Sequence, residues 1–321
     1  MSLKTRINGK KPQTARRTAT VGGKEVLLAE PYRPRVQPEC VGMEHAKRLI
    51  TAAWMRSDGN HLELHPFLIG APGVGKTHVC CEMARQSGRD LYIIQGHEDI
   101  TAEDIACTVR FSDDPDARME YVASPLVTSM LLGQVCLIDE LGKLRPKALA
   151  SLASVLDYRG YVDSILLGAR VEAHPGFRFC ASTNTADMAG NAVPEFILSR
   201  LLPRISVGYP RREQVEKIIA RRFTELKDVG ALFGMFWDDL WFRHPGSEPP
   251  TPRQTIQVFA LAANLAACEA LGPAKARRTL RGNGTTSVEA RHLELAFAQI
   301  FNNQEGEKDE AEDEPVHADS W

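Results

Sequence analysis

The feature that most limits what this chain can fold into is the run Gly70-Ala-Pro-Gly73-Val-Gly75-Lys76-Thr77, a complete GxxxxGK[ST] motif. The apolar stretch His65–Ile69 leads into it, and a segment of helical character, His78–Arg85, leads out. In such a strand–loop–helix unit the glycines let backbone N–H groups turn inward around phosphates, and the helix N-terminus adds its positive end. Lys76 can then reach the β- and γ-phosphates, and the Thr77 hydroxyl can ligate Mg²⁺. The motif therefore predicts a phosphate-binding loop.

Two acidic residues follow another apolar run. Val135–Ile138 lead directly into Asp139 and Glu140. A buried strand of this kind delivers its carboxyl end to the same sheet edge as the phosphate loop. There Asp139 would hold Mg²⁺ through water, and Glu140 would polarise the attacking water as general base. A glutamate beside the metal-holding aspartate predicts hydrolysis as well as binding.

Short apolar strands alternate with helical segments up to about residue 209, which is typical of a parallel sheet covered on both faces. The strand candidates are Pro66–Gly70, Leu91–Gln95, Val135–Asp139, Phe177–Ser182 and Arg204–Val207. Beyond Tyr209-Pro210 only helices are indicated, at Arg211–Leu226, Leu232–Phe242, Pro252–Ala270 and, from a capping-box pattern Thr286-x-x-Glu289, Ser287–Asn302. We expect an α/β fold at 21–209, an αβα sandwich with a five-stranded parallel sheet, followed by a small all-helical lid domain at 210–303.

The two ends of the chain carry opposite charge. The 321 residues include 39 Lys or Arg and 41 Asp or Glu, yet residues 1–20 hold six cations and residues 304–321 hold eight acids. We expect both tails to be solvated and disordered, with a docking role as the alternative. The body between them is nearly neutral, which argues against a surface for duplex nucleic acid.

Composition bears on the cellular compartment. The sequence has no run of about 18 apolar residues, so no membrane span is expected. Seven cysteines at irregular spacing indicate reduced thiols in a cytoplasmic protein.

Polar residues near two further strands complete the candidate site. Asn184 follows the strand Phe177–Ser182 and could hydrogen-bond a γ-phosphate or orient water, although an Asn in this place is commonly a turn residue. Arg200 and Arg204 end an amphipathic helix that begins at Pro194. Each is either a solvated charge or a cation that a neighbouring subunit offers to the transition state.

Taken together, these motifs resemble those of the AAA+ ATPases, and more closely the MoxR group with its dynein- and midasin-like relatives. Besides the motifs above, the resemblance is carried by Cys40-Val-Gly-Met-Glu44, Asp139-Glu-Leu-Gly-Lys143, Val155-Leu-Asp-Tyr-Arg159-Gly, Ala173-His-Pro-Gly-Phe177, Arg204-Ile-Ser-Val-Gly-Tyr-Pro210 and Thr251-Pro-Arg253. It covers roughly residues 38–302.

The resemblance implies roles for individual residues. Val41 and Gly42 would line the adenine pocket, Asn184 would be sensor 1, Arg200 the arginine finger acting in trans, and Arg253 sensor 2. ATP with Mg²⁺ would lie on Gly70, Ala71, Pro72, Gly73, Val74, Gly75, Lys76, Thr77, His78 and Asp139, with Glu140 as the catalytic base. Leu201 departs from the phenylalanine usual after the finger, and Arg204 remains an alternative finger.

Two inserted hairpins are expected, within residues 106–122 and 161–173. The first would carry Asp113, Asp114 and Asp116 at its tip, and the second would expose Leu166 and Leu167. Acidic and apolar tips suit a protein substrate better than a phosphodiester backbone, although plain surface hairpins remain the alternative.

We therefore expect an ATPase that assembles into a homo-oligomeric ring, a hexamer by resemblance, and remodels or activates a partner protein. The resemblance suggests a metalloenzyme or a von Willebrand factor A domain protein as that partner. Two rival functions stay open: a nucleic-acid-associated motor or restriction-type NTPase that uses the basic N-terminal arm, and a nucleotide-gated scaffold with little turnover.

Overall fold

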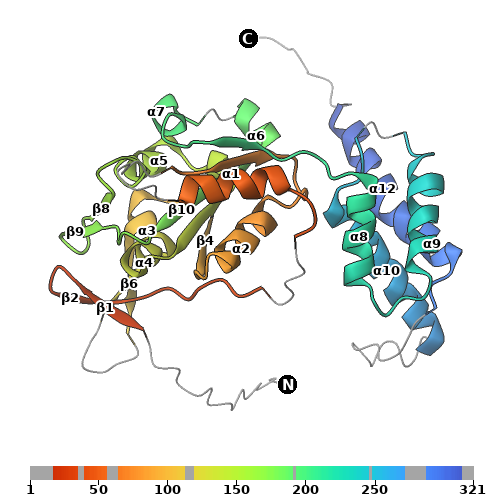
Figure 1. Ribbon diagram of the computed structural model, residues 1–321, viewed down its shortest axis with the longest axis horizontal. Helices are drawn as coiled ribbons and strands as arrows, with labels where there is room; N and C mark the ends of the chain where they lie inside the picture. Colours follow the sequence, from red (N-terminus) through yellow and green to blue (C-terminus); the bar gives the residue numbers. More distant parts are fainter. Residues whose placement is uncertain are drawn as a thin grey trace, which may run out of the picture. The chain divides into compact units, whose positions relative to one another are not determined.

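The structure, a computed structural model, describes residues 17–34, 40–55, 64–112, 119–190, 193–245, 248–271 and 287–312. These residues divide into two compact units (Figure 1). The first is drawn from positions 1–35, 45–69 and 77–206, and the second from positions 36–44, 70–76 and 207–321. Each unit has an apolar core of its own.

The first unit is built on a five-stranded sheet in the order β11-β3-β10-β7-β4. Its strands are β3 (Phe67–Gly70), β4 (Leu91–Gln95), β7 (Val135–Asp139), β10 (Arg178–Asn184) and β11 (Arg204–Ser206). The registers of β4 with β7, β7 with β10 and β3 with β11 are parallel. All five predicted strands are present within one or two residues, and the predicted parallel sheet is confirmed.

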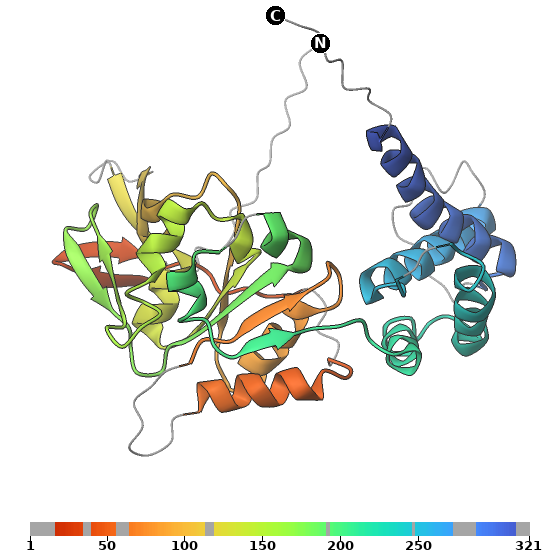
Figure 2. The same ribbon diagram turned by 90° about the horizontal axis from the view of Figure 1, so that it is seen from above.

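Helices cover both faces of this sheet, which is why its strands are apolar without alternation. On one face Trp54 Nε1 of α1 (Glu44–Trp54) donates to Phe179 O at 3.1 Å, and Cys80 Sγ of α2 (Lys76–Gln86) lies 3.2 Å from Cys180 Sγ. The other face is covered by α3 (Ala102–Ala106), α4 (Pro125–Leu132) and α5 (Pro146–Leu152) (Figure 2). The predicted αβα sandwich is therefore confirmed.

Three hairpins surround this sandwich. The two predicted ones are β5 (Cys107–Phe111) with β6 (Met119–Ala123), and β8 (Tyr161–Ser164) with β9 (Ala169–Glu172). The third, β1 (Thr18–Val21) with β2 (Lys24–Leu27), joins the first in a four-stranded sheet of order β1-β2-β6-β5. Lys24 Nζ also donates to Leu166 O at 2.9 Å, so the N-terminal hairpin bridges both insertions.

The β1–β2 hairpin was not predicted, because residues 18–20 were assigned to the basic tail. The remainder of that tail, residues 1–16, lies outside the described residues. The acidic tip Asp113, Asp114 and Asp116 also lies outside them. At the second tip Leu166 is exposed as predicted, whereas Leu167 is buried because it packs into the core. Ile165 beside them is exposed as well.

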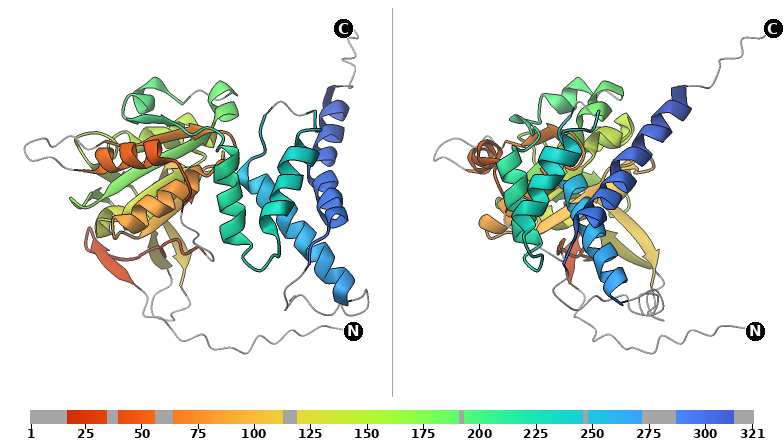
Figure 3. Two further views of the ribbon diagram at one scale, coloured as in Figure 1. Left: turned by 45° about the vertical axis from the view of Figure 1, so that its right-hand side comes forward. Right: turned by 90° about the vertical axis from the view of Figure 1, so that its right-hand side faces the viewer.

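The second unit contains the helices α8 (Arg212–Arg222), α9 (Val229–Gly234), η2 (Met235–Trp241), α10 (Pro252–Leu271) and α12 (Ala290–Glu312) (Figure 3). Its core is aromatic, with Phe233, Phe236 and Phe259 fully buried and Phe297 nearly so. Arg212 of α8 pairs with Asp238 of η2 at 2.7 Å. These elements match the predicted helical region.

Both ends of α12 differ from the prediction. The helix begins at Ala290, and Glu289 N donates to His292 Nδ1 at 3.0 Å, so Glu289 precedes the helix instead of completing a capping box within it. At the other end α12 runs to Glu312, past residue 304, where the acidic tail was expected to begin. Glu, Gln, Lys and Ala are strong helix formers, which offsets the local charge density. Residues 313–321 lie outside the described ranges.

Candidate functional site

Two oxygen ligands meet where β7 ends and α2 begins. Thr77 Oγ1, in the first turn of α2, donates to Asp139 Oδ2 at 2.6 Å. The other carboxylate oxygen, Oδ1, accepts from Ser182 Oγ and from Glu140 N at 3.1 Å. Asp139 is thereby fixed by groups from α2, β10 and its own strand. A hydroxyl and a carboxylate held together in this way are the hard oxygen donors that suit Mg²⁺.

Glu140 has an unusual backbone conformation. Its φ of 57° lies in the left-handed region, which is uncommon for residues other than glycine. The end of β4 lies against it: Gly96 N donates to Asp139 O at 2.7 Å, and a Cβ built on Gly96 would lie 2.4 Å from Glu140 O. The glycine at position 96 therefore makes room for the turn that carries Glu140.

Several polar groups surround the Glu140 carboxylate. Lys143 Nζ, one turn further along, lies 2.7 Å from Oε2. This hydrogen bond is the main reason that the pKa of Glu140 lies below its usual value, and hydrogen bonds from Gln95 and Asn184 lower it further. Asn184 ends β10 and also donates to Asp187 Oδ2 at 3.1 Å. The predicted base and the predicted sensor thus lie together at one sheet edge.

The glycine-rich loop belongs to the second unit. Gly73 and Gly75 have φ values of 80° and 107°, a backbone that residues with a Cβ rarely adopt. Lys76 is buried, and its Nζ donates to Gly70 O at 2.8 Å and to Ala71 O at 2.9 Å. The amine is therefore held against two carbonyl groups of its own loop. Ala71, Pro72 and Val74 complete the loop, and His78 follows Thr77 on α2.

Two other predicted nucleotide contacts lie in the same unit as this loop. Arg253 is the second residue of α10, whose start is capped by Thr251: Thr251 N donates to Gln254 Oε1, and Gln254 N to Thr251 Oγ1. A Cβ on Gly73 would lie 2.9 Å from Arg253 Cβ, so α10 begins beside the loop. Val41 and Gly42 adjoin α8, since a Cβ on Gly42 would lie 2.4 Å from Gln214 Nε2.

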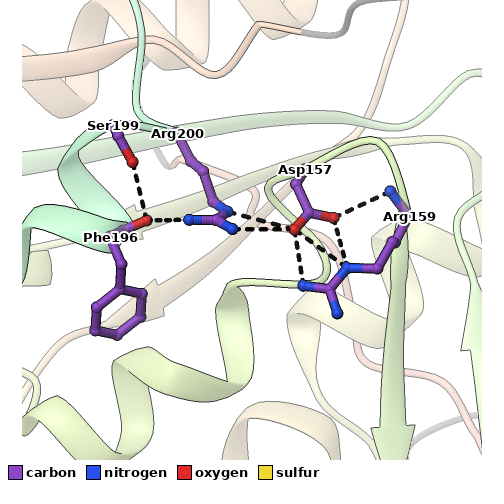
Figure 4. A network of polar contacts seen from close by, with 5 residues as sticks. All are labelled: Asp157, Arg159, Phe196, Ser199 and Arg200. Atoms are coloured by element: carbon purple, nitrogen blue, oxygen red, sulfur yellow. Dashed lines mark hydrogen bonds and ion pairs between the residues drawn. The ribbon is translucent and has the colours of Figure 1, made fainter.

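The two candidate finger residues are placed differently from the prediction. Helix α7 spans only Glu195–Leu198, so Arg200 lies in the turn after it and Arg204 is the first residue of β11. The expectation that both share one helix is wrong, because Pro203 disfavours helical backbone at Leu202. Arg200 contacts Asp157 and the Phe196 carbonyl (Figure 4), whereas Arg204 Nη2 donates to Leu198 O at 3.2 Å.

Sequence reasoning missed Gln95, Gly96, Lys143, Ser182 and Asp157. Gln95 ends a predicted strand and Gly96 directly follows it, at the edge where phosphate-binding residues were expected, which was a usable signal. Lys143 stands three residues after Glu140, the spacing of an ion pair on a helical turn. Asp157 gave no signal of its own, because its partner Arg200 is 43 residues distant.

The fold and this site define a protein of the P-loop AAA+ class. Residues 65–201 match the family described as AAA domain, dynein-related subfamily. Protein NorQ of Paracoccus denitrificans is 30% identical over 122 residues, covering 38% of this chain and 44% of that protein. Gas vesicle ATPase GvpN2 of Halobacterium salinarum is 29% identical over 190 residues, covering 52% and 54%.

A solved structure, a mutant of RuvB from Thermotoga maritima, aligns with a TM-score of 0.52 at 19% identity, covering 83% of this chain and 73% of that chain. At this identity the likeness shows the fold alone. The chain therefore has the P-loop AAA+ fold and is similar to AAA+ proteins of the dynein-related, MoxR-like group. It spans only about half of the length of the curated relatives named above. No helix in the described ranges is long and apolar enough to cross a membrane.

Proposed function

We propose that this chain binds ATP with Mg²⁺ at the loop Gly70–Thr77 and hydrolyses it, with Glu140 as the general base. The observation that carries the proposal is the 2.6 Å contact of Thr77 with Asp139, directly beside the Glu140 carboxylate. A binding site alone would not require that second acid. The proposal agrees with the name of one relative, the gas vesicle ATPase GvpN2.

Each residue has a chemical task in this scheme. The backbone N–H groups of the loop and Lys76 would bind the phosphates, and Thr77 and Asp139 would hold Mg²⁺. When bound, the metal would neutralise charge on the phosphate oxygens. Glu140 would accept the proton of the attacking water, and Asn184 would orient that water or the γ-phosphate.

The ring is part of the same proposal. Arg200 would reach the γ-phosphate bound by a neighbouring copy, and Arg253 would contact the nucleotide in its own chain as sensor 2. A cation in this place stabilises the charge that spreads over the transferring phosphoryl group. The support is family resemblance together with the position of Arg200, whose side chain is half-buried and 30% accessible in the first unit.

The proposed function also includes a partner protein on which the ATPase acts. We infer that hydrolysis drives remodelling or activation of a client, of which a metalloenzyme or a von Willebrand factor A domain protein is the candidate class. Removal of the γ-phosphate would release the contacts that hold neighbouring copies together. Affinity capture with the Glu140→Gln variant in the presence of ATP, followed by identification of the bound chains, tests this part. Capture of nucleic acid instead would favour the rival motor.

The hydrolysis proposal is tested by steady-state ATPase assays on Glu140→Gln. We expect turnover to fall by about 10²- to 10⁴-fold, the contribution of a positioned general base, while ATP binding persists. Glu172→Gln, which changes an exposed glutamate of β9 in the same way, is the matched control and should leave turnover unchanged. Undiminished turnover in Glu140→Gln would point to another base. Very low turnover in the unmodified chain would favour the nucleotide-gated scaffold.

A further inference from the structure

Two arginines share one carboxylate at the surface of the first unit. Asp157, in the segment between α5 and β8, contacts Arg159 and Arg200 (Figure 4). Only 13% of the Asp157 side chain is accessible, against 38% for Arg159 and 30% for Arg200. One negative charge therefore serves two cations, and the group carries a net positive charge.

The two arginines are held unequally. Arg159 Nη2 lies 2.8 Å from Asp157 Oδ2 and its Nε 3.0 Å from Oδ1, while its backbone N–H also donates to Oδ1 at 3.0 Å. Arg200 reaches only Oδ2, through Nη2 at 3.3 Å and Nε at 3.4 Å. The Arg159 contacts have the short, bidentate geometry of a strong ion pair, and the Arg200 contacts lie at the weak limit.

The carboxylate keeps a partner whether or not Arg200 leaves. Hydrogen bonds from Arg159 are the largest cause that lowers the pKa of Asp157 to about 2, with Arg200 a smaller one, so the group stays ionised at any working pH. A buried carboxylate left without a partner is costly, but Arg159 removes that cost here. Arg200 can therefore exchange Asp157 for another anion at a small energetic penalty.

The orientation of Arg200 is nevertheless defined. Its Nη1 donates to the carbonyl of Phe196, in α7, while Nε and Nη2 face Asp157. An arginine side chain has a large number of rotamers, and fixing them beforehand lowers the entropy lost when it binds its target. The carbonyl and the carboxylate together hold the guanidinium at the surface in one direction.

We propose that Asp157 is a positioning residue: it holds Arg200 ready at the surface and releases it to the terminal phosphate bound by a second copy of this chain. The inference rests on the proposed function, in which Arg200 acts in trans. Asp157 touches no substrate and acts only through Arg200. Its effect should therefore appear at the site of the neighbouring copy and not in the nucleotide affinity of its own chain.

The test uses Asp157→Asn in the full chain. We expect its ATPase turnover to fall by roughly 10- to 100-fold, the effect of a misplaced catalytic group, with nucleotide affinity unchanged in titration calorimetry. Asp157→Glu, which keeps the charge, should recover at least part of the loss. Asp163→Asn is the matched control, because Asp163 forms an exposed 3.0 Å pair with Arg170 and should leave turnover unchanged.

Mixing experiments locate the defect. Lys76→Ala has an inactive site but an intact finger, whereas Asp157→Asn has an intact site and a misplaced finger. In head-to-tail rings assembled from an equal mixture, roughly a quarter of the interfaces would join an intact site to an intact finger. We therefore expect the mixture of the two poorly active variants to reach about a quarter of the ATPase activity of the unmodified chain. Recovery also shows that Asp157→Asn is folded.

The outcomes separate this inference from the function on which it rests. Full ATPase activity of Asp157→Asn alone would overturn the inference. It would also be overturned if Asp157→Asn mixed with Lys76→Ala regains no activity, while Arg200→Ala mixed with Lys76→Ala does. If the Arg200→Ala mixture also fails to recover, the trans role of Arg200 in the proposed function is wrong.

Discussion

At the scale of single residues, the site depends on a backbone position that costs energy. Glu140 adopts left-handed φ, which is unfavourable by about 1–2 kcal/mol for a residue with a Cβ. The hydrogen bond of Glu140 N to Asp139 Oδ1 and the ion pair with Lys143 offset that cost. This turn places the Glu140 carboxylate at the sheet edge. It also requires Gly96, directly after β4, to lie close to the Glu140 backbone.

Gly96→Ala tests this requirement. The new Cβ would lie 2.4 Å from Glu140 O and 3.0 Å from Asp139 O, so the backbone of the acidic pair must shift. We expect the free energy of unfolding to fall by about 1–3 kcal/mol. Under the proposed function, turnover falls at least about tenfold as the base moves. Urea denaturation and ATPase assays measure the two effects.

Gly230→Ala serves as the control for Gly96→Ala. Gly230 lies in α9, and nothing lies within 4 Å of its Cβ position, so the substitution should leave stability equal or slightly higher. Equal turnover in Gly96→Ala and the unmodified chain would show that the approach of β4 does not set the position of Glu140.

The residues that belong to recognisable sequence motifs were predicted, whereas residues that act through contacts distant in the sequence were missed. The phosphate loop, Asp139, Glu140 and Asn184 stand at recognisable places after strands, and the structure brings Thr77, Asp139, Glu140 and Asn184 to one edge. Gly96 and Asp157 matter through neighbours 44 and 43 residues away, which no local pattern shows.

At the scale of elements, the segment that leads into β3 contains a buried histidine. His65 is 3% exposed, its ring lies edge-on to Phe179 with centroids 5.8 Å apart, and Nδ1 has no hydrogen-bond partner among the described residues. Burial, and then the charge of Arg178, lower its pKa to about 4, while Asp157 acts in the opposite direction. His65 is therefore neutral in the folded protein.

This burial predicts a pH dependence of stability. The unfolded chain binds a proton at His65 near pH 6.5, whereas the folded one does so only near pH 4. The stabilisation is thus present above pH 6.5, and it declines as the pH falls towards 4. We expect His65 to account for a loss of about 2 kcal/mol between pH 7 and pH 5. Urea unfolding at both pH values, compared with His65→Gln, measures it. An equal slope in both proteins would contradict the assignment.

The elements themselves were predicted unevenly. Strands buried on both faces are continuous apolar runs, so the five central strands were found with nearly correct ends. The β1–β2 hairpin was missed, because residues 1–20 were assigned to a basic tail, although Gly22-Gly23 after the β-branched Thr20 and Val21 is a strong turn signal. The start of α12 was misplaced because the capping pattern was taken to include Glu289, which precedes the helix.

At the scale of the whole molecule, the described residues form two compact units, each with an apolar core of its own. The loop Gly70–Lys76 belongs with the helical unit, whereas Thr77 and the acidic pair belong with the sheet. Under the proposed function, completion of the site also needs Arg200 from another copy.

The most direct measurement of the central claim is specific ATPase activity as a function of protein concentration, with sedimentation velocity on the same samples. We predict that activity per chain rises with concentration, reaches a plateau where the rings are fully assembled, and follows the assembled fraction throughout. Full activity per chain at concentrations where the protein sediments as single copies would contradict the claim that a neighbouring copy completes the site.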